Sequence, residues 1–114
     1  MFYVLQIERC FMLVTTADIV PGTQVQVLGL VRGNVVWTTH AGKDFLAGFK
    51  TMVGGEITGY TTMTNDARAI AENRMVEQAQ SLGADAVVAT RFGESSVLAG
   101  SIEMLCYGTA VKFV

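Results

Sequence analysis

The chain has 114 residues and a mass of 12.2 kDa, and its eight basic and ten acidic residues give a formal net charge of −2. The charges are scattered, so no basic stripe is present to neutralise phosphates, and nucleic acid is not an expected partner. With 51% hydrophobic and 16% charged residues, the chain is too apolar for a disordered protein. It has no apolar run of the roughly 20 residues that a membrane span needs. We therefore expect one folded domain that does not act in a membrane.

The excess of apolar residues predicts self-association. An average soluble domain has about 25% charged residues, and this chain has 16%. A domain this short buries only about two-thirds of the surface that its unfolded chain exposes. The chain therefore holds more apolar side chain than a small monomer readily hides, and we expect the remainder to lie in contacts between subunits.

The first eleven residues and the two cysteines indicate the cellular compartment in which the protein is expected. The apolar run 1–5 is interrupted by Glu8 and Arg9, and no basic region leads into a long apolar stretch with a cleavage site, so a signal peptide is not expected. The two cysteines, Cys10 and Cys106, are far apart, which is neither a disulfide framework nor a CxxC metal motif. This usage fits the reducing cytoplasm.

The next segment predicts two strands. Pro21 and Gly22 form a turn dipeptide, after which β-branched and aliphatic residues dominate positions 25–31. Arg32, Gly33 and Asn34 follow, and apolar residues resume at 35–37. Because glycine and asparagine tolerate the positive φ of a tight turn, the pattern predicts a hairpin that turns at Gly33.

Two helices are predicted in the middle of the chain. Phe45, Leu46, Phe49, Met52 and Val53 lie on one helical face, which predicts a helix over 43–53 that stops at the glycine pair 54–55. A second helix is expected from Thr61 or Thr64 to Leu82.

The second helix carries a broad face of small residues and is followed by two more strands. The face comprises Ala67, Ile70, Ala71, Met75, Ala79 and Leu82. Such a face can approach a sheet or another helix closely, and we also considered it as a subunit interface that Ala79→Glu would disrupt. Arg74 falls within this arc, where its stem could lie along apolar surface with the charge in water, or reach an acidic partner on another subunit; the first is favoured.

Strands are expected over 85–91 and 103–113, joined by a loop over 93–101. The predicted order is then β-β-α-α-β-β. Helices clustered in the middle of the chain favour an α+β fold, a small largely antiparallel sheet with two helices, over an alternating α/β fold.

Candidate catalytic residues are few. His40 is the only histidine, and Asp44 lies four residues after it. With Ser95 or Ser96 one can compose a Ser-His-Asp trio, but no GxSxG motif is present. A capping or solvent-facing histidine is the expected role, and a hydrolytic enzyme is the weaker alternative. The glycines form neither GxGxxG nor GxxxxGK[ST], so a known nucleotide-binding loop is not expected.

The candidate metal ligands are also few. Cys106, His40 and Cys10 lack the spacing of a closed zinc site. Cys106 falls in a predicted strand among apolar residues, where a free cysteine usually behaves as a small hydrophobe. A symmetric ring could still bring together one Cys106 or one His40 from each subunit, so a heavy metal or another small ligand at subunit interfaces remains an alternative.

Several segments resemble, in order, the YbjQ-like family of small bacterial proteins, which is labelled as a heavy-metal-binding family of uncharacterised function. The matching segments are Thr15-Thr16, Gly29-Leu30-Val31-x-Gly33, the 44–53 helix with Gly54-Gly55, Tyr60, Ala67-Arg68, Gly83-Ala84-x-Ala86-Val87 and Gly108-Thr109-Ala110-Val111. The similarity covers nearly the whole chain from Leu13 to Val111.

The resemblance implies a dodecin-like α+β subunit that assembles into a homopentameric ring. It also divides the chain into a single domain over 12–114 and a possible extension over 1–11, since family members begin close to the Thr15-Thr16 pair. The extension is consistent with a longer gene assignment, an engineered addition or an added strand. Glu56 replaces a common arginine, and Gly93-Glu94 replaces aromatic and acidic positions, so a site that depends on these positions is in doubt. The expected role is non-enzymatic binding or scaffolding.

Overall fold

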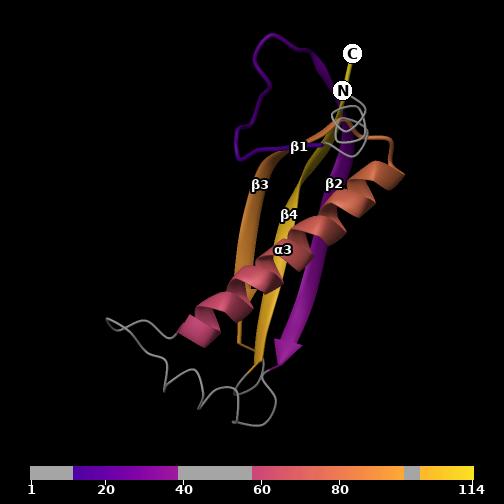
Figure 1. The fold of residues 1–114 in the computed structure, drawn as a ribbon. Coiled ribbons are helices and arrows are strands. Elements are labelled where there is room, and N and C mark those ends of the chain that lie inside the picture. Colours follow the sequence, from indigo (N-terminus) through magenta and orange to yellow (C-terminus); the bar gives the residue numbers. More distant parts are fainter. Residues whose placement is uncertain (1–11, 39–57, 97–100) are drawn as a thin grey trace, which may run out of the picture.

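The computed structural model describes residues 12–38, 58–96 and 101–114, in which one helix lies across one face of a four-stranded sheet (Figure 1). The elements are β1 (Leu13–Val14), β2 (Val25–Thr38), α3 (Thr58–Ser81), β3 (Ala86–Ser95) and β4 (Ser101–Phe113). The expected α+β class is therefore confirmed. The helix expected over 43–53 lies outside the described residues. In the part of the chain that is described, no helix is long and apolar enough to cross a membrane.

The sheet is mixed, which corrects the expectation of a largely antiparallel one. Its order is β1-β3-β4-β2. β4 pairs antiparallel with both β3 and β2, but β1 pairs parallel with β3, through Leu13 opposite Ala86 and Val14 opposite Val87. A parallel neighbour requires a long crossover, and here the chain passes through β2 and α3 before it returns as β3.

The predicted hairpin at Gly33 is wrong, because β2 runs without a turn from Val25 to Thr38. Gly33 lies opposite Cys106 in the middle of the strand. A Cβ added there would lie 2.7 Å from the Cβ of Arg74 and closer still to the Ala71 carbonyl oxygen and the Met75 amide nitrogen. Glycine is therefore needed here for the close approach of α3 to the strand, a use that the local sequence does not distinguish from a turn.

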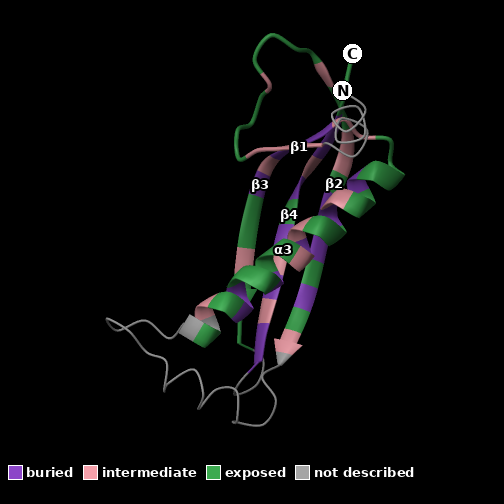
Figure 2. Cartoon of the chain, in the orientation of Figure 1, coloured by how far each residue is buried: buried purple, intermediate pink, exposed green. Residues whose placement is uncertain are grey.

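The small-residue face of α3 packs against the sheet. Ala67, Ala71, Met75 and Ala79 are fully buried at a spacing of four residues, and Figure 2 shows buried positions along α3 and β4. Ala79 therefore belongs to the core of the subunit itself, so Ala79→Glu would damage this core and would not report on a subunit interface. The predicted small face of the second helix is confirmed for these four residues, but Leu82, which was also placed on it, follows the end of the helix and is 48% exposed. α3 begins at Thr58 and ends at Ser81.

The helix ends where Gly83 was expected to end it. Gly83 has a φ of 77°. Its amide donates to the Gln80 carbonyl at 3.0 Å, and the Ala84 amide donates to the Ala79 carbonyl at 3.1 Å. These two bonds form a Schellman motif, in which a left-handed residue, usually glycine, lets the last carbonyls find donors. The motif turns the chain from α3 into β3.

A bulge in β3 connects this strand with the segment that follows β1. The register with β4 shifts between Val88 and Arg91, and Ala89 has a φ of 53°, which is unusual for a residue other than glycine. The Ala89 amide donates to the Ala17 carbonyl at 2.8 Å, and the Thr90 amide donates to the Thr15 carbonyl at 3.0 Å. The Thr15-Thr16 pair therefore has a structural role next to β3.

The bulge also buries the hydroxyl of Thr90, which is 3% exposed and whose Oγ1 finds no hydrogen-bond partner among the described residues. An unsatisfied buried polar group costs free energy. We expect Thr90→Val, which keeps the side-chain shape, to raise the free energy of unfolding by about 1 kcal/mol, as measured by urea denaturation. Thr90→Ser retains the hydroxyl and should give no such gain. A clear loss of stability in Thr90→Val would contradict the interpretation.

Candidate functional site

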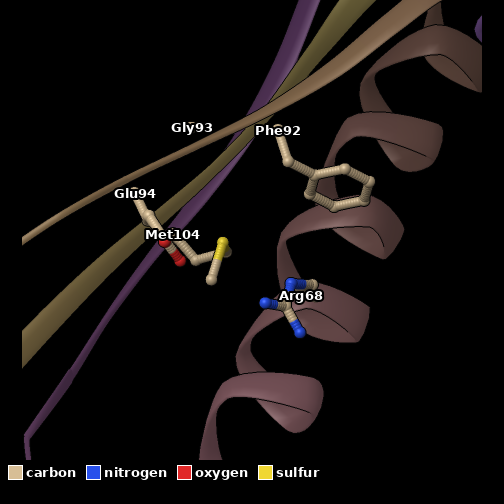
Figure 3. Close-up of a pocket in the computed structure, with 5 residues that line it drawn as sticks. All are labelled: Arg68, Phe92, Gly93, Glu94 and Met104. Carbon is tan, nitrogen blue, oxygen red and sulfur yellow. The ribbon is translucent and has the colours of Figure 1, made fainter.

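An open pocket of about 230 Å³ lies between the first half of α3 and the second half of β3. It is lined by Arg68, Phe92, Gly93, Glu94 and Met104. Figure 3 shows the guanidinium of Arg68 reaching from α3 toward the strands, with the Phe92 ring projecting from β3 toward the helix. One cation, one anion, an aromatic ring and a thioether therefore surround a single space.

The strand register explains why these side chains meet. Phe92 is opposite Cys106 and Glu94 is opposite Met104. Residues directly opposite one another in an antiparallel pair project from the same face. Since Cys106 and Met104 belong to the core beneath α3, Phe92 and Glu94 also project from the face that carries the helix. The β3 bulge sets this alternation, because it shifts the pairing of every residue after Val88.

Sequence reasoning noted Arg68 only within a family motif and found no role for Phe92. The available signal was weak, because alternation along β3 cannot be extrapolated through a bulge. Ser95 and Ser96 are both hydrogen-bonded. The Ser95 hydroxyl donates to a Glu103 carboxylate oxygen at 3.3 Å, and the Ser96 hydroxyl donates to the Ser101 carbonyl at 3.2 Å. His40 and Asp44, the other members of the possible trio, lie outside the described residues.

Cys106 is fully buried between β4 and α3. Its Sγ donates to the Sδ of Met75 at 3.6 Å. Burial and, to a smaller extent, the negative charge of Glu72 raise the pKa of the Cys106 thiol from 9.0 to about 11. The thiol is therefore protonated at neutral pH. Among the described residues, no three His, Cys, Asp or Glu side chains gather as possible metal ligands. Cys10 and His40 lie outside these residues.

The raised pKa of Cys106 predicts a loss of stability in alkali. Between pH 9 and 11 the unfolded chain releases the thiol proton while the folded chain keeps it, so the unfolded state binds fewer protons and stability falls as pH rises. We expect this term to reach about 1 kcal/mol at pH 10. Urea denaturation from pH 7.5 to 10 under reducing conditions should give a steeper decline for the native chain than for Cys106→Ala. Equal slopes would contradict the assignment.

The sheet face opposite α3 exposes a row of large apolar side chains, which we call the outer apolar face. It consists of Val27, Leu30 and Val36 on β2 and Tyr107 on β4. Leu30 is opposite Thr109 and Val36 is opposite Glu103. Thr109 and Glu103 alternate along β4 with the residues that face α3, so Leu30 and Val36 project from the other face of the sheet. Val27 and Leu30 are each 66% exposed. At one end of this face Ala86, Val88 and Val111 form a small buried cluster, against which Leu13, Val20 and Val25 pack.

α3 protects the middle of the β2 edge. β2 is the last strand in the sheet order and pairs with β4 alone among the described strands. The Arg32 amide donates to the Gln78 side-chain oxygen at 2.7 Å, and Arg74 donates to the Asn34 carbonyl, also at 2.7 Å. Exposed strand edges otherwise pair with other chains. Arg74 therefore caps an edge within its own subunit, a role that was not considered from the sequence.

Comparisons with known proteins agree with the sequence motifs. A family described as "Putative heavy-metal-binding", the YbjQ family, matches residues 12–114. A UPF0145 protein of Thermotoga petrophila is 53% identical over 102 residues, which cover 89% of this chain and 96% of that protein. A UPF0145 protein of Vibrio parahaemolyticus is 55% identical over 104 residues, covering 90% of this chain and 99% of the relative.

A solved structure supports the fold. It is a crystal structure of a protein of unknown function from Pediococcus pentosaceus, assigned to the DUF74 family, with a TM-score of 0.67 and 14% sequence identity. The match covers 90% of this chain and 98% of that chain. At this identity the likeness concerns the fold alone. Because the family match spans residues 12–114 and relatives more than 50% identical align over most of both chains, this chain belongs to the YbjQ family.

Proposed function

We propose that the protein is the subunit of a homo-oligomeric ring, with a pentamer favoured, and that it has a non-enzymatic binding or scaffold role in the cytoplasm. The observation that carries the proposal is the outer apolar face. The aliphatic side chains of Val27, Leu30 and Val36, all on β2, are each more than half exposed to water. Large apolar side chains exposed on one face of a sheet are typical of interaction sites.

A second copy of the chain is the occupant that fits this face. The chain carries only 16% charged residues, so the same apolar surplus recurs in every copy. A head-to-tail contact between identical subunits closes into a ring when the rotation between neighbours permits. The resemblance to YbjQ-like rings favours five subunits. The scaffold role follows from the same surface, and the free buried thiol of Cys106 supports a reducing compartment.

We expect Leu30→Glu to dissociate the assembly. A carboxylate buried at an apolar contact must lose its hydration, whereas Leu30 is 66% exposed in the single subunit and its replacement leaves the core intact. Native mass spectrometry of untagged protein should give an oligomer, with a pentamer favoured, for the native chain and monomers for Leu30→Glu. Circular dichroism should report an unchanged fold.

Gln80→Glu is the matched control, because it adds the same charge at an exposed position of α3. It should leave the oligomer intact. A native chain that is monomeric at micromolar concentration would overturn the ring. A Leu30→Glu variant that remains assembled would remove the outer apolar face from the proposal.

Heavy-metal binding is the second candidate function, and the observation that favours it is the pair of sulfur atoms from Cys106 and Met75, 3.6 Å apart. Thiolate and thioether sulfur are soft ligands that select ions such as Cu(I). The pair lies inside the subunit, so a Cys106 site would form there with Met75. A site built from His40 would instead draw on one residue from each subunit.

Anaerobic Cu(I) titration of untagged protein against a competing chelator would test this candidate. Stoichiometric binding that Cys106→Ser abolishes would support a sulfur site, and binding that only His40→Ala abolishes would support a shared site. Absence of binding, or binding that neither change affects, would contradict the candidate.

A further inference from the structure

The pocket beside Arg68 presents groups of opposite charge on its two walls. The Arg68 guanidinium comes from α3, and the Glu94 carboxylate comes from β3 and lies beside Met104 on the strand side (Figure 3). Arg68 and Glu94 form no ion pair with each other among the described residues, in which Arg68 donates only to the Asn65 side-chain oxygen, at 2.9 Å. Both charges therefore face the pocket without neutralising each other.

Arg68 is suited to hold a carboxylate. A guanidinium carries five N–H donors in a planar fork that matches the two oxygens of a carboxylate. The bond to Asn65 uses one terminal nitrogen and fixes the side chain against α3. The remaining donors stay available to a ligand. Lysine would supply the charge without this fork.

The other walls are apolar. Phe92 is 45% exposed, although its ring projects from the face of the sheet that α3 covers. Met104, which is 1% exposed, forms the base next to the main core. An aromatic face attracts a cation as well as apolar groups. A ligand here would therefore place an apolar part on Met104 and Phe92.

The volume limits the size of the ligand. At about 230 Å³ the space is smaller than the roughly 300–1,000 Å³ of pockets that hold drug-sized ligands. The space therefore suits a small ligand better than a nucleotide or a larger cofactor.

We propose that this pocket binds a free α-amino acid with an apolar side chain. Its carboxylate pairs with Arg68, its ammonium group lies between Glu94 and the Phe92 ring, and its side chain contacts Met104. All five lining residues belong to one chain, so the proposal does not depend on the ring. A monomer that binds the amino acid would overturn the ring and uphold the site.

Three probes that share one branched apolar tail test the proposal. L-leucine carries both charges, 4-methylpentanoate lacks the ammonium group, and 3-methylbutylamine lacks the carboxylate. With methionine methyl groups labelled with ¹³C, NMR titration should show a saturable shift of the Met104 signal. The Met75 signal serves as an internal reference, because Met75 is fully buried and does not line the pocket. L-leucine should bind at least about tenfold more tightly than either single-charge probe.

Charge-removing variants then assign each contact. Arg68→Gln should weaken L-leucine binding about tenfold or more, to the level of 3-methylbutylamine, and Glu94→Gln should weaken it to the level of 4-methylpentanoate. The matched controls Arg32→Gln on β2 and Glu77→Gln on α3 remove the same charges outside the pocket and should leave the affinity unchanged. Absence of a Met104 shift with L-leucine, equal affinity for all three probes, or an affinity unchanged in Arg68→Gln would each overturn the proposal.

Discussion

Replacing Gly33 by alanine is expected to lower the free energy of unfolding by about 3 kcal/mol or more, the largest loss that we predict from a single methyl group. The added Cβ would lie 2.7 Å from the Cβ of Arg74 and would overlap the backbone of α3 at Ala71 and Met75. Backbone atoms in the middle of a helix cannot rotate away as a side chain can, so the whole helix must shift from the sheet. Urea denaturation at a fixed protomer concentration measures the loss.

Gly93→Ala is the matched control for this prediction. Gly93 also lies within a strand, but a Cβ added there would meet no atom within 4 Å, and its φ is not in the left-handed region. Alanine should be neutral or slightly stabilising at this position, because it lowers the entropy of the unfolded chain. If Gly33→Ala and Gly93→Ala lowered the free energy of unfolding equally, alanine would be unfavourable in both strands for a general reason. The close approach of α3 to Gly33 would then not account for the loss.

Truncation of Met75 should cost about 3 kcal/mol, within the range of 2–5 kcal/mol for large buried side chains replaced by alanine. Met75 is fully buried and is among the largest side chains of the core. Its neighbours along the face of α3 are alanines. Since alanines cannot expand into the space that Met75 leaves, the cavity should persist and the full cost should be measured. Thermal and urea unfolding would both report it.

A conservative change at the same position separates volume from chemistry. Met75→Leu keeps most of the volume and should cost less than about 1.5 kcal/mol, although it removes the sulfur that accepts from Cys106. A loss in Met75→Leu as large as that in Met75→Ala would contradict a simple cavity effect. It would instead indicate that the contact between the two sulfur atoms contributes strongly to stability.

Local patterns in the sequence predicted much of the fold. The i, i+4 spacing of small residues from Ala67 to Ala79 predicted the buried face of α3, and the glycine at position 83 predicted its end. The strands expected over 85–91 and 103–113 are present, although β3 extends to Ser95 and β4 begins at Ser101. These features depend on interactions between residues close together in the chain, so periodicity and propensity suffice to indicate them.

Tertiary structure decided what depends on distant residues. From the sequence alone Gly33 is predicted to be a turn residue, because the absence of a Cβ suits a turn and a close approach equally well. Only the tertiary structure shows that α3 lies against it. The parallel position of β1 and the bulge at Ala89 follow from pairing between segments more than 70 residues apart. The pocket follows in turn, since that bulge determines which residues of β3 face α3. The sequence by itself determined the α+β class, the principal helix and the apolar surplus, whereas strand register and backbone proximity, which are cooperative properties of the packed chain, decided the candidate site.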